Sequence, residues 1–210
     1  MLPADAQVFL GRLTRLDPAA VVRLRAAAAG RTALWGRLPW GVLVTREVAA
    51  SVPDADLTVV ATALLAASDT WPQRCDAQWR WPLPPRSGEV VEEVPAADVR
   101  AVAAAAAGTL RQVSAAGVAG RAVGSRVVRE ALLDHVAIVV ETPDTPRLEV
   151  PQRLVQGVVR MGFLGPPGTP DPVRVRRAGD WVGLVARYGT AWLPGPGALT
   201  LRPAGPRRHP

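Results

Sequence analysis

The sequence predicts an α+β fold, with helices packed on mostly antiparallel strands. Three observations predict it. Segment 95–116 is dense in alanine and is followed by Gly117, which is typical of a long helix with a glycine C-cap. Segment 135–141 is rich in β-branched residues, which favours a buried strand. The last third of the chain alternates short apolar runs with glycine and proline turns, which predicts a β-rich C-terminal part.

In the first half of the chain we expect helices interspersed with short strands. Apolar residues recur at helical spacing near the start, and Asp17-Pro18 can cap and begin a second helix that Gly30 ends. Two strand-like runs joined at Pro39-Trp40-Gly41 predict a hairpin. The expected elements are helices over 8–16, 17–29 and 57–65, and strands over 32–38, 42–48, 78–81 and 89–94.

The second half is expected to finish as a run of strands. A helix over 151–162 followed by a basic-edged hairpin resembles the end of a winged helix-turn-helix, although residues 135–150 lie where a winged domain would have a short turn. The expected elements are helices over 95–116, 123–134 and 151–162, and strands over 135–141, after the loop 142–147, and over 173–177, 181–188, 190–193 and 198–202.

Composition suggests two parts with a soft boundary near 84–97. We expect an N-terminal α+β part over 1–94, a basic α+β part over 95–202 and a flexible tail over 203–210. Strands on both sides of the boundary could join one sheet, so the two parts could also form one continuous domain. No internal repeat is visible in the sequence.

The charge of the chain is carried by arginine alone. All 25 basic residues are arginine, and the net charge is +7, which predicts a nucleic-acid partner. Complete absence of lysine, together with alanine runs and 21 prolines, is also what GC-rich codon usage produces. Residues 1–105 hold 11 arginines and 11 acids, whereas residues 106–210 hold 14 arginines and 7 acids. Codon usage does not by itself remove acids from one half. The arginine surplus in the second half therefore supports a nucleic-acid partner better than the total charge does.

Cysteine usage and hydropathy indicate the compartment. A single cysteine, Cys75, excludes an intramolecular disulfide and a multi-cysteine zinc site. The first residues lack the basic region and apolar core of a signal peptide. No run of about 18 apolar residues occurs, which is close to the minimum for a membrane-spanning helix. We therefore expect a cytoplasmic protein with no membrane partner; the oligomeric state stays open.

The first functional hypothesis is a non-enzymatic protein that associates with nucleic acid through arginines of the C-terminal half. In the expected helix over 151–162, basic and amide side chains occupy one face and apolar side chains the other. In the following hairpin, valine and arginine alternate, so one face is basic. Solvated arginines on an ordinary helix and sheet explain the same pattern. The candidate contacts are Arg153, Gln156, Arg160, Arg174, Arg176 and Arg177, with Arg126 and Arg129 as a second patch.

A glycine-rich segment over 117–124 precedes the helix that begins near Ser125. Free N–H groups at a helix start, together with Arg121, could hold a phosphate or carboxylate, with Gly124 and Ser125 at the site. It is not a P-loop, because that motif requires a lysine. A plain turn between two helices, with Ser125 as the N-cap, accounts for the same residues.

The second hypothesis is a protein–protein interaction or scaffold module. Trp79-Arg80-Trp81 interleaves aromatic and cationic groups, and Leu83-Pro84-Pro85-Arg86 lies in a proline-rich loop. Exposed tryptophan and arginine are enriched at interaction hot spots. In an alternating strand, however, both tryptophans would lie on the same buried face.

The third hypothesis is an enzyme or small-ligand protein using His135 and the loop 117–124. Asp134 could orient the imidazole of His135, but no spaced nucleophile accompanies the pair. One cysteine, one histidine and scattered acids show no metal-ligand spacing. The sequence therefore favours a protein that is not an enzyme and predicts neither cofactor nor metal.

Several phrases resemble those of a family of hypothetical proteins from GC-rich actinobacteria. They include the segments over 36–46, 79–85, 132–142, 149–165 and 180–193. The resemblance spans about residues 7–202 and is consistent with the codon-usage explanation of the arginines. It implies no activity and no site residues.

Overall fold

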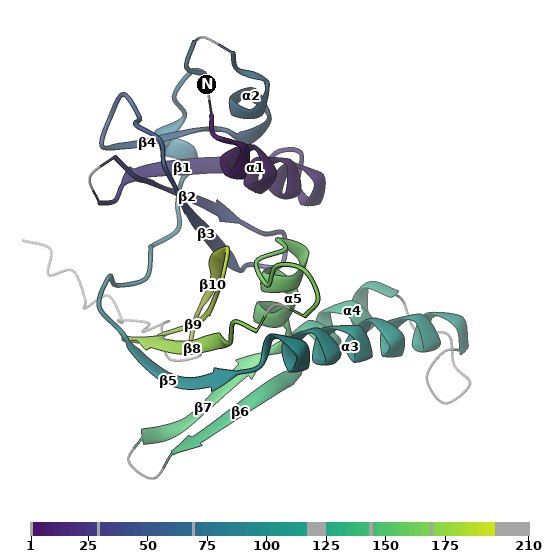
Figure 1. The fold of residues 1–210 in the computed structure, drawn as a ribbon. Helices are drawn as coiled ribbons and strands as arrows, with labels where there is room; N and C mark the ends of the chain where they lie inside the picture. The colour runs from purple at the N-terminus through teal and green to yellow at the C-terminus, as the bar shows by residue number, and fades with distance from the viewer. Residues whose placement is uncertain are drawn as a thin grey trace, which may run out of the picture.

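The computed structural model describes residues 2–28, 30–68, 70–116, 125–142, 145–168 and 170–195. Its centre is an eight-stranded antiparallel sheet with the order β4-β1-β2-β3-β10-β9-β8-β5 (Figure 1). The strands of this sheet are β1 (Val21–Ala26), β2 (Thr32–Arg37), β3 (Leu43–Val48), β4 (Asp56–Val60), β5 (Glu89–Val94), β8 (Val173–Ala178), β9 (Trp181–Ala186) and β10 (Gly189–Pro194).

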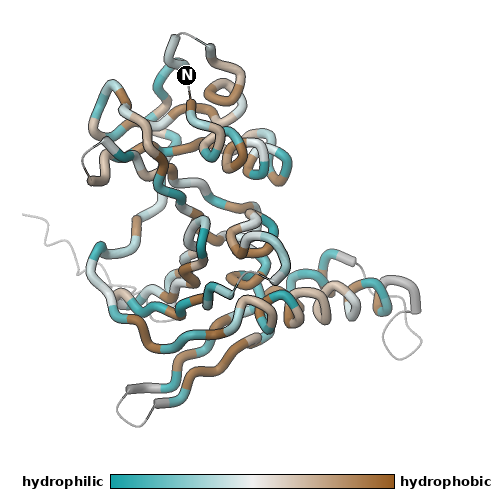
Figure 2. Tube along the Cα trace, viewed as in Figure 1, coloured by the Kyte–Doolittle hydropathy of each residue, from teal (hydrophilic) through white to brown (hydrophobic). Residues whose placement is uncertain are grey.

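Helices and a separate two-stranded ribbon complete the described fold. The helices are α1 (Ala4–Leu16), α2 (Ala61–Ala66), α3 (Ala96–Ala116), α4 (Ser125–Asp134) and α5 (Gln152–Arg160). The ribbon pairs β6 (Val136–Thr142) with β7 (Thr145–Pro151), and Figure 2 shows the mainly apolar course of β6. The predicted α+β class is therefore confirmed.

The two halves of the large sheet repeat one order of elements. Helix α1 is followed by β1, β2 and β3, and α5 is followed by β8, β9 and β10. Strands β4 and β5 flank the two sets at the opposite edges. At the centre β3 pairs antiparallel with β10, with Val44 opposite Ala191. The strand order therefore reads β1-β2-β3 outward-to-centre in one half and β8-β9-β10 outward-to-centre in the other, which describes an approximate two-fold relation between the halves. The sequence does not reveal this relation.

Helices α1 and α5 cover one face of the sheet with a shared core. Both helices bury apolar residues at helical spacing, and the rings of Phe9 and Phe163 stack with their centroids 6.3 Å apart. Glycines allow close approach: a Cβ at Gly36 would lie 2.7 Å from a methyl of Leu13. The core residues contributed by the two helices are Ala6, Phe9, Leu10 and Leu13 of α1 and Leu154, Val155 and Val158 of α5.

The predicted helix over 17–29 is wrong, because these residues form a turn and strand β1. Val22 and Leu24 are buried while the residues that follow each of them, Arg23 and Arg25, are not, so the segment has the two-residue period of a strand. Asp17 accepts a hydrogen bond from the Ala19 N–H in a local turn instead of capping a helix. Pairing with both β2 and β4 outweighs the helix-start signal of Asp17-Pro18.

Two further expectations differ in detail. Residues 78–81 form no strand; a single 3-10 turn over Asp76–Gln78 leads into an extended segment. The segment expected as a helix over 57–65 divides into β4 and the short α2.

Helix α5 does precede the antiparallel hairpin β8–β9, as predicted, but the hairpin lies inside the eight-stranded sheet rather than forming a free wing. Within the part of the chain that the structure describes, no helix combines the length and apolarity needed to cross a membrane.

Candidate functional site

An open groove of about 830 Å³ lies where β3 meets β10; most of its floor is on the outer face of the sheet, the face opposite α1 and α5, and its lining also includes Asp5 of α1. Its floor contains Trp35 and Thr45 from one half of the sheet, and Thr190 and Trp192 from the other. Thr45 and Thr190 face each other across the central β3–β10 pairing. The walls are the β1–β2 connection, the β9–β10 turn and residues 83–86, which we call the strap. The groove therefore lies where the two halves of the sheet meet.

Arginines dominate the charged lining of this groove. The lining contains two acids, Asp5 and Glu47. It contains six arginines that come from both halves of the chain, namely Arg25, Arg31, Arg46, Arg86, Arg176 and Arg187. Because all six residues line one hollow, the positive potentials of those not balanced by carboxylates add there.

Carboxylates balance only some of these arginines. Arg31 and Glu47 form an ion pair of 3.5 Å, and Arg46 and Asp5 another of 3.5 Å. Arg25 lies 3.2 Å from Asp56, and Arg187 pairs with Asp171. The remaining two have no carboxylate partner among the described residues. Arg176 donates to the Gly88 carbonyl at 3.1 Å, and Arg86 makes no polar contact with the residues that the structure describes.

An aromatic ring contacts two of the groove arginines. The guanidinium carbons of Arg46 and Arg187 each lie 5.4 Å from the centroid of the Tyr188 ring, which is within cation–π range. Tyr188 is half-buried, and its backbone N–H donates to the Phe163 carbonyl at 3.0 Å, which ties the β9–β10 turn to the core. The wall thus offers fixed cationic and aromatic groups side by side.

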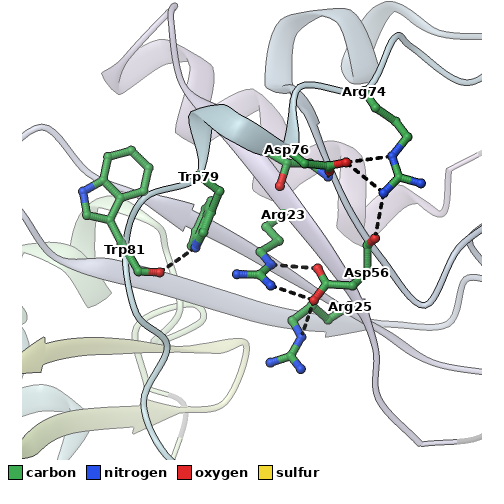
Figure 3. Close-up of polar contacts among 8 residues, drawn as sticks. Arg23, Arg25, Asp56, Arg74, Asp76, Trp79 and Trp81 are labelled. Atoms are coloured by element: carbon green, nitrogen blue, oxygen red, sulfur yellow. Dashed lines mark hydrogen bonds and ion pairs between the residues drawn. The ribbon is translucent and has the colours of Figure 1, made fainter.

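The segment that leads to the strap is held on the outer face by two tryptophans (Figure 3). The indole N–H of Trp79 donates to the Trp81 carbonyl at 2.7 Å, and the two rings pack edge to face. Arg23 lies over the Trp79 ring and Arg37 over the Trp81 ring. Both tryptophans are half-buried by contacts within the chain, so only their remaining edges can contact a partner protein.

An ion-pair network anchors the start of the same segment to the sheet (Figure 3). Arg23 donates twice to the Asp56 carboxylate, at 2.7 Å each. Asp76 accepts the Thr58 backbone N–H at 2.6 Å and pairs with Arg74 at 2.8 Å. The hydrogen bond from Arg23 holds the pKa of Asp56 below its ordinary value, and the Thr58 N–H does the same for the pKa of Asp76.

Acid is expected to release this segment. A carboxyl with a lowered folded pKa stabilises the fold fully above its unfolded value, about 3.9, and the contribution disappears as pH falls through the folded value. Stability should therefore fall below about pH 4, as measured by urea denaturation followed through tryptophan emission. Asp56→Asn should shrink this acid-dependent loss, while Asp180→Asn, at an exposed carboxyl without an ion pair among the described residues, should not. An unchanged acid profile in Asp56→Asn would contradict the assignment.

Comparison with family models divides the chain in two. Residues 3–85 match a domain of unknown function (DUF8010), and residues 83–198 match a second domain of unknown function (DUF8185). The chain belongs to the DUF8185 family. This confirms the expectation of an uncharacterised family. The two matches meet at residues 83–85, within the strap of this DUF8185 protein.

One solved structure relates the fold of this DUF8185 protein to a larger one. It is the DnaN sliding clamp, DNA polymerase III subunit beta, from Bartonella birtlesii bound to griselimycin, with a TM-score of 0.50 and 13% sequence identity. The match covers 93% of this chain but 64% of that chain, so the DUF8185 protein spans less than two thirds of the clamp. The likeness concerns the fold. The comparison with curated proteins gives no match.

The arginines predicted from sequence do not gather in one place in this DUF8185 protein. Arg176 lines the groove. Arg153 is engaged elsewhere, since it donates to the Trp40 carbonyl at 2.9 Å and pairs with Asp134, while the Trp40 indole N–H donates to the Arg153 carbonyl. Gln156 donates to the Ala103 carbonyl at 3.5 Å. These contacts join α5 to its neighbours.

The other predicted residues lie on separate surfaces. Arg126 pairs with Glu130 at 3.1 Å along α4, and Arg129 and Arg160 are exposed on α4 and α5. Arg174 and Arg177 of β8 lie opposite Glu93 and Glu89 of β5. The predicted anion site falls largely outside the described residues, which exclude Arg121, Gly124 and the side chain of Ser125.

Sequence analysis missed five groove arginines: Arg25, Arg31, Arg46, Arg86 and Arg187. They come from five elements, namely β1, the β1–β2 connection, β3, the strap and the β9–β10 turn, and only the fold brings them together. One signal was available. The alternation of apolar and basic residues over 21–26 predicts a strand with a basic outer face, which would have placed Arg25 there.

His135 offers no catalytic arrangement with its neighbours. It is exposed, it does not line the groove, and its backbone carbonyl accepts the Gln152 N–H at 2.8 Å. Its neighbour Asp134 pairs with Arg153. Within the described ranges no three His, Cys, Asp or Glu side chains are grouped to hold a metal ion.

Proposed function

We propose that this protein is a non-enzymatic nucleic-acid-binding protein of the bacterial cytoplasm, and that its groove contacts the phosphate backbone. One observation carries the proposal. Six arginines from both halves of the chain border a single groove whose lining holds two acids. A phosphate backbone is the abundant polyanion that such a groove fits, because the planar guanidinium fork matches phosphate oxygens.

The clustering of these arginines is not explained by the general arginine excess of the chain. Codon usage raises arginine content everywhere but does not bring arginines of β1, β3, β8, the strap and two connections to one hollow. The fold likeness to a subunit of DNA polymerase III, at a TM-score of 0.50, gives further support to a role near nucleic acid.

Binding to labelled oligonucleotides tests the proposal. We expect the protein to raise the fluorescence anisotropy of a 20-nucleotide strand or a 20-bp duplex at about 50 mM salt, with affinity falling steeply as salt rises. Arg86→Ala with Arg176→Ala should weaken binding to all sequences. It should also reduce the slope of log K against log salt by about one for each arginine removed.

A matched control keeps the net charge equal. Arg129→Ala with Arg160→Ala removes the same charge from exposed positions outside the groove. It should leave affinity and salt slope close to wild type. If this control loses binding and the groove variant keeps it, the helix surfaces are the site. If the wild-type protein binds neither probe at about 50 mM salt, nucleic-acid binding is refuted.

A further inference from the structure

The groove is shaped to take unpaired bases as well as phosphates. Its volume of about 830 Å³ lies within the range of small-molecule pockets, about 300–1,000 Å³. A nucleotide base with its sugar can enter a hollow of that size. A duplex keeps its bases stacked inside the helix and would meet only the rim of the groove through its phosphates.

The groups inside the hollow suit base stacking. Tyr188 lines the groove, and the guanidinium carbons of Arg46 and Arg187 each lie 5.4 Å from its ring centroid. Unpaired bases stack on aromatic rings and on arginine planes, and such stacking tolerates any base because every base has a π face. Trp35 on the floor and the two prolines of the strap add apolar surface beside these groups.

The ion pairs of these arginines strengthen the case for stacking over simple charge attraction. Arg187 is held by Asp171, and Arg46 by Asp5 at 3.5 Å. The carboxylates orient the guanidinium planes and reduce the net charge that they offer to a phosphate. Arg86 and Arg176, which have no carboxylate partner among the described residues, remain to meet the backbone.

We propose that the groove binds a single-stranded polynucleotide in preference to a duplex, with a base added to the stack formed by Arg46, Tyr188 and Arg187. The inference rests on the proposed function and specifies its ligand. In this arrangement the accessible guanidinium plane of Arg187 meets the unpaired base and Tyr188 supports that plane, while Arg86 and Arg176 contact the phosphates.

The test compares four fluorescein-labelled probes of equal length by anisotropy: oligo-dT, oligo-U, a mixed-sequence duplex, and an oligo-dT strand with abasic sites along its middle. Wild-type protein should bind oligo-dT or oligo-U about tenfold or more tightly than the duplex, the effect expected of one stacked base. The abasic strand should bind as weakly as the duplex. The dT and U arms distinguish DNA from RNA.

Variants at one position separate stacking from folding. Tyr188→Leu should lose about tenfold in affinity for the single strand and little for the duplex, because it removes the ring that supports the stacking guanidinium plane but removes no charge. Tyr188→Phe keeps the ring and should bind like wild type. Thermal denaturation of both variants checks the fold, and the abasic comparison on wild-type protein decides the matter even if Tyr188→Leu fails to fold.

The outcomes distinguish the two proposals. Equal binding of strand, abasic strand and duplex, with loss only in the Arg86 and Arg176 variant, overturns the preference for unpaired bases and leaves nucleic-acid binding intact. Binding of no probe overturns both.

Discussion

Phe163→Ala is expected to lower the free energy of unfolding by about 3–5 kcal/mol. Phe163 follows α5 and is 1% exposed. Its ring stacks on Phe9 of α1, and it closely underlies Gly189, where a Cβ would lie 2.6 Å from a ring carbon. Truncation therefore removes apolar burial and leaves a cavity between elements of both halves of the sheet. Urea denaturation followed by circular dichroism measures the effect.

Two controls accompany this variant. Phe163→Leu keeps most of the apolar volume and should cost clearly less than alanine. Val8→Ala changes a side chain of α1 that is 49% exposed, and it should alter stability by no more than about 0.5 kcal/mol. A loss below about 1 kcal/mol in Phe163→Ala would show that α1 and the end of α5 do not share one core.

Gly183→Ala is expected to destabilise the protein by about 1–3 kcal/mol. Gly183 lies in β9 beside Trp192 of β10, and a Cβ there would lie 2.5 Å from a carbon of the indole ring. The ring is buried in the outer-face cluster with Leu43 and Ala178 and is rigid, so it cannot yield as a flexible side chain would. Because Trp192 also forms the groove floor, oligonucleotide binding should weaken in the same variant.

The same substitution should act with the opposite sign at another glycine. Gly108 lies inside α3, and a Cβ there would meet no atom within 4 Å. Gly108→Ala should stabilise the protein by up to about 1 kcal/mol, because alanine has the higher helix propensity. Parallel urea denaturations of the two variants give a direct comparison. Stabilisation by Gly183→Ala would contradict the packing of Trp192 over β9.

Local pattern predicted much of the secondary structure. The alanine-rich α3, the β-branched β6 and the valine–arginine alternation of β8 each form near their expected positions, because helix and strand periods are properties of neighbouring residues. Residues 17–29 failed because a good helix-start signal at Asp17-Pro18 competed with the two-residue period of 21–26. Sheet pairing on both sides of β1 decided that competition.

The candidate site could be predicted only in part. Sequence located the charge surplus in the second half, yet most groove arginines come from the first half. Arg153 carries the same charge as Arg86, but contacts with Trp40 and Asp134 make Arg153 a structural residue. Whether an arginine is occupied or available depends on partners distant in sequence, which no local pattern contains.

The sequence alone thus determined that this is an arginine-only α+β protein without a recognisable catalytic motif, since composition and periodicity are local. The tertiary structure alone decided the site. Antiparallel pairing of β3 with β10 joins strands from opposite ends of the chain. The Trp79–Trp81 packing holds the segment that leads to the strap against the outer face, beside this pairing. Because guanidinium potentials add only at short range, this non-local pairing is what turns scattered arginines into one basic groove.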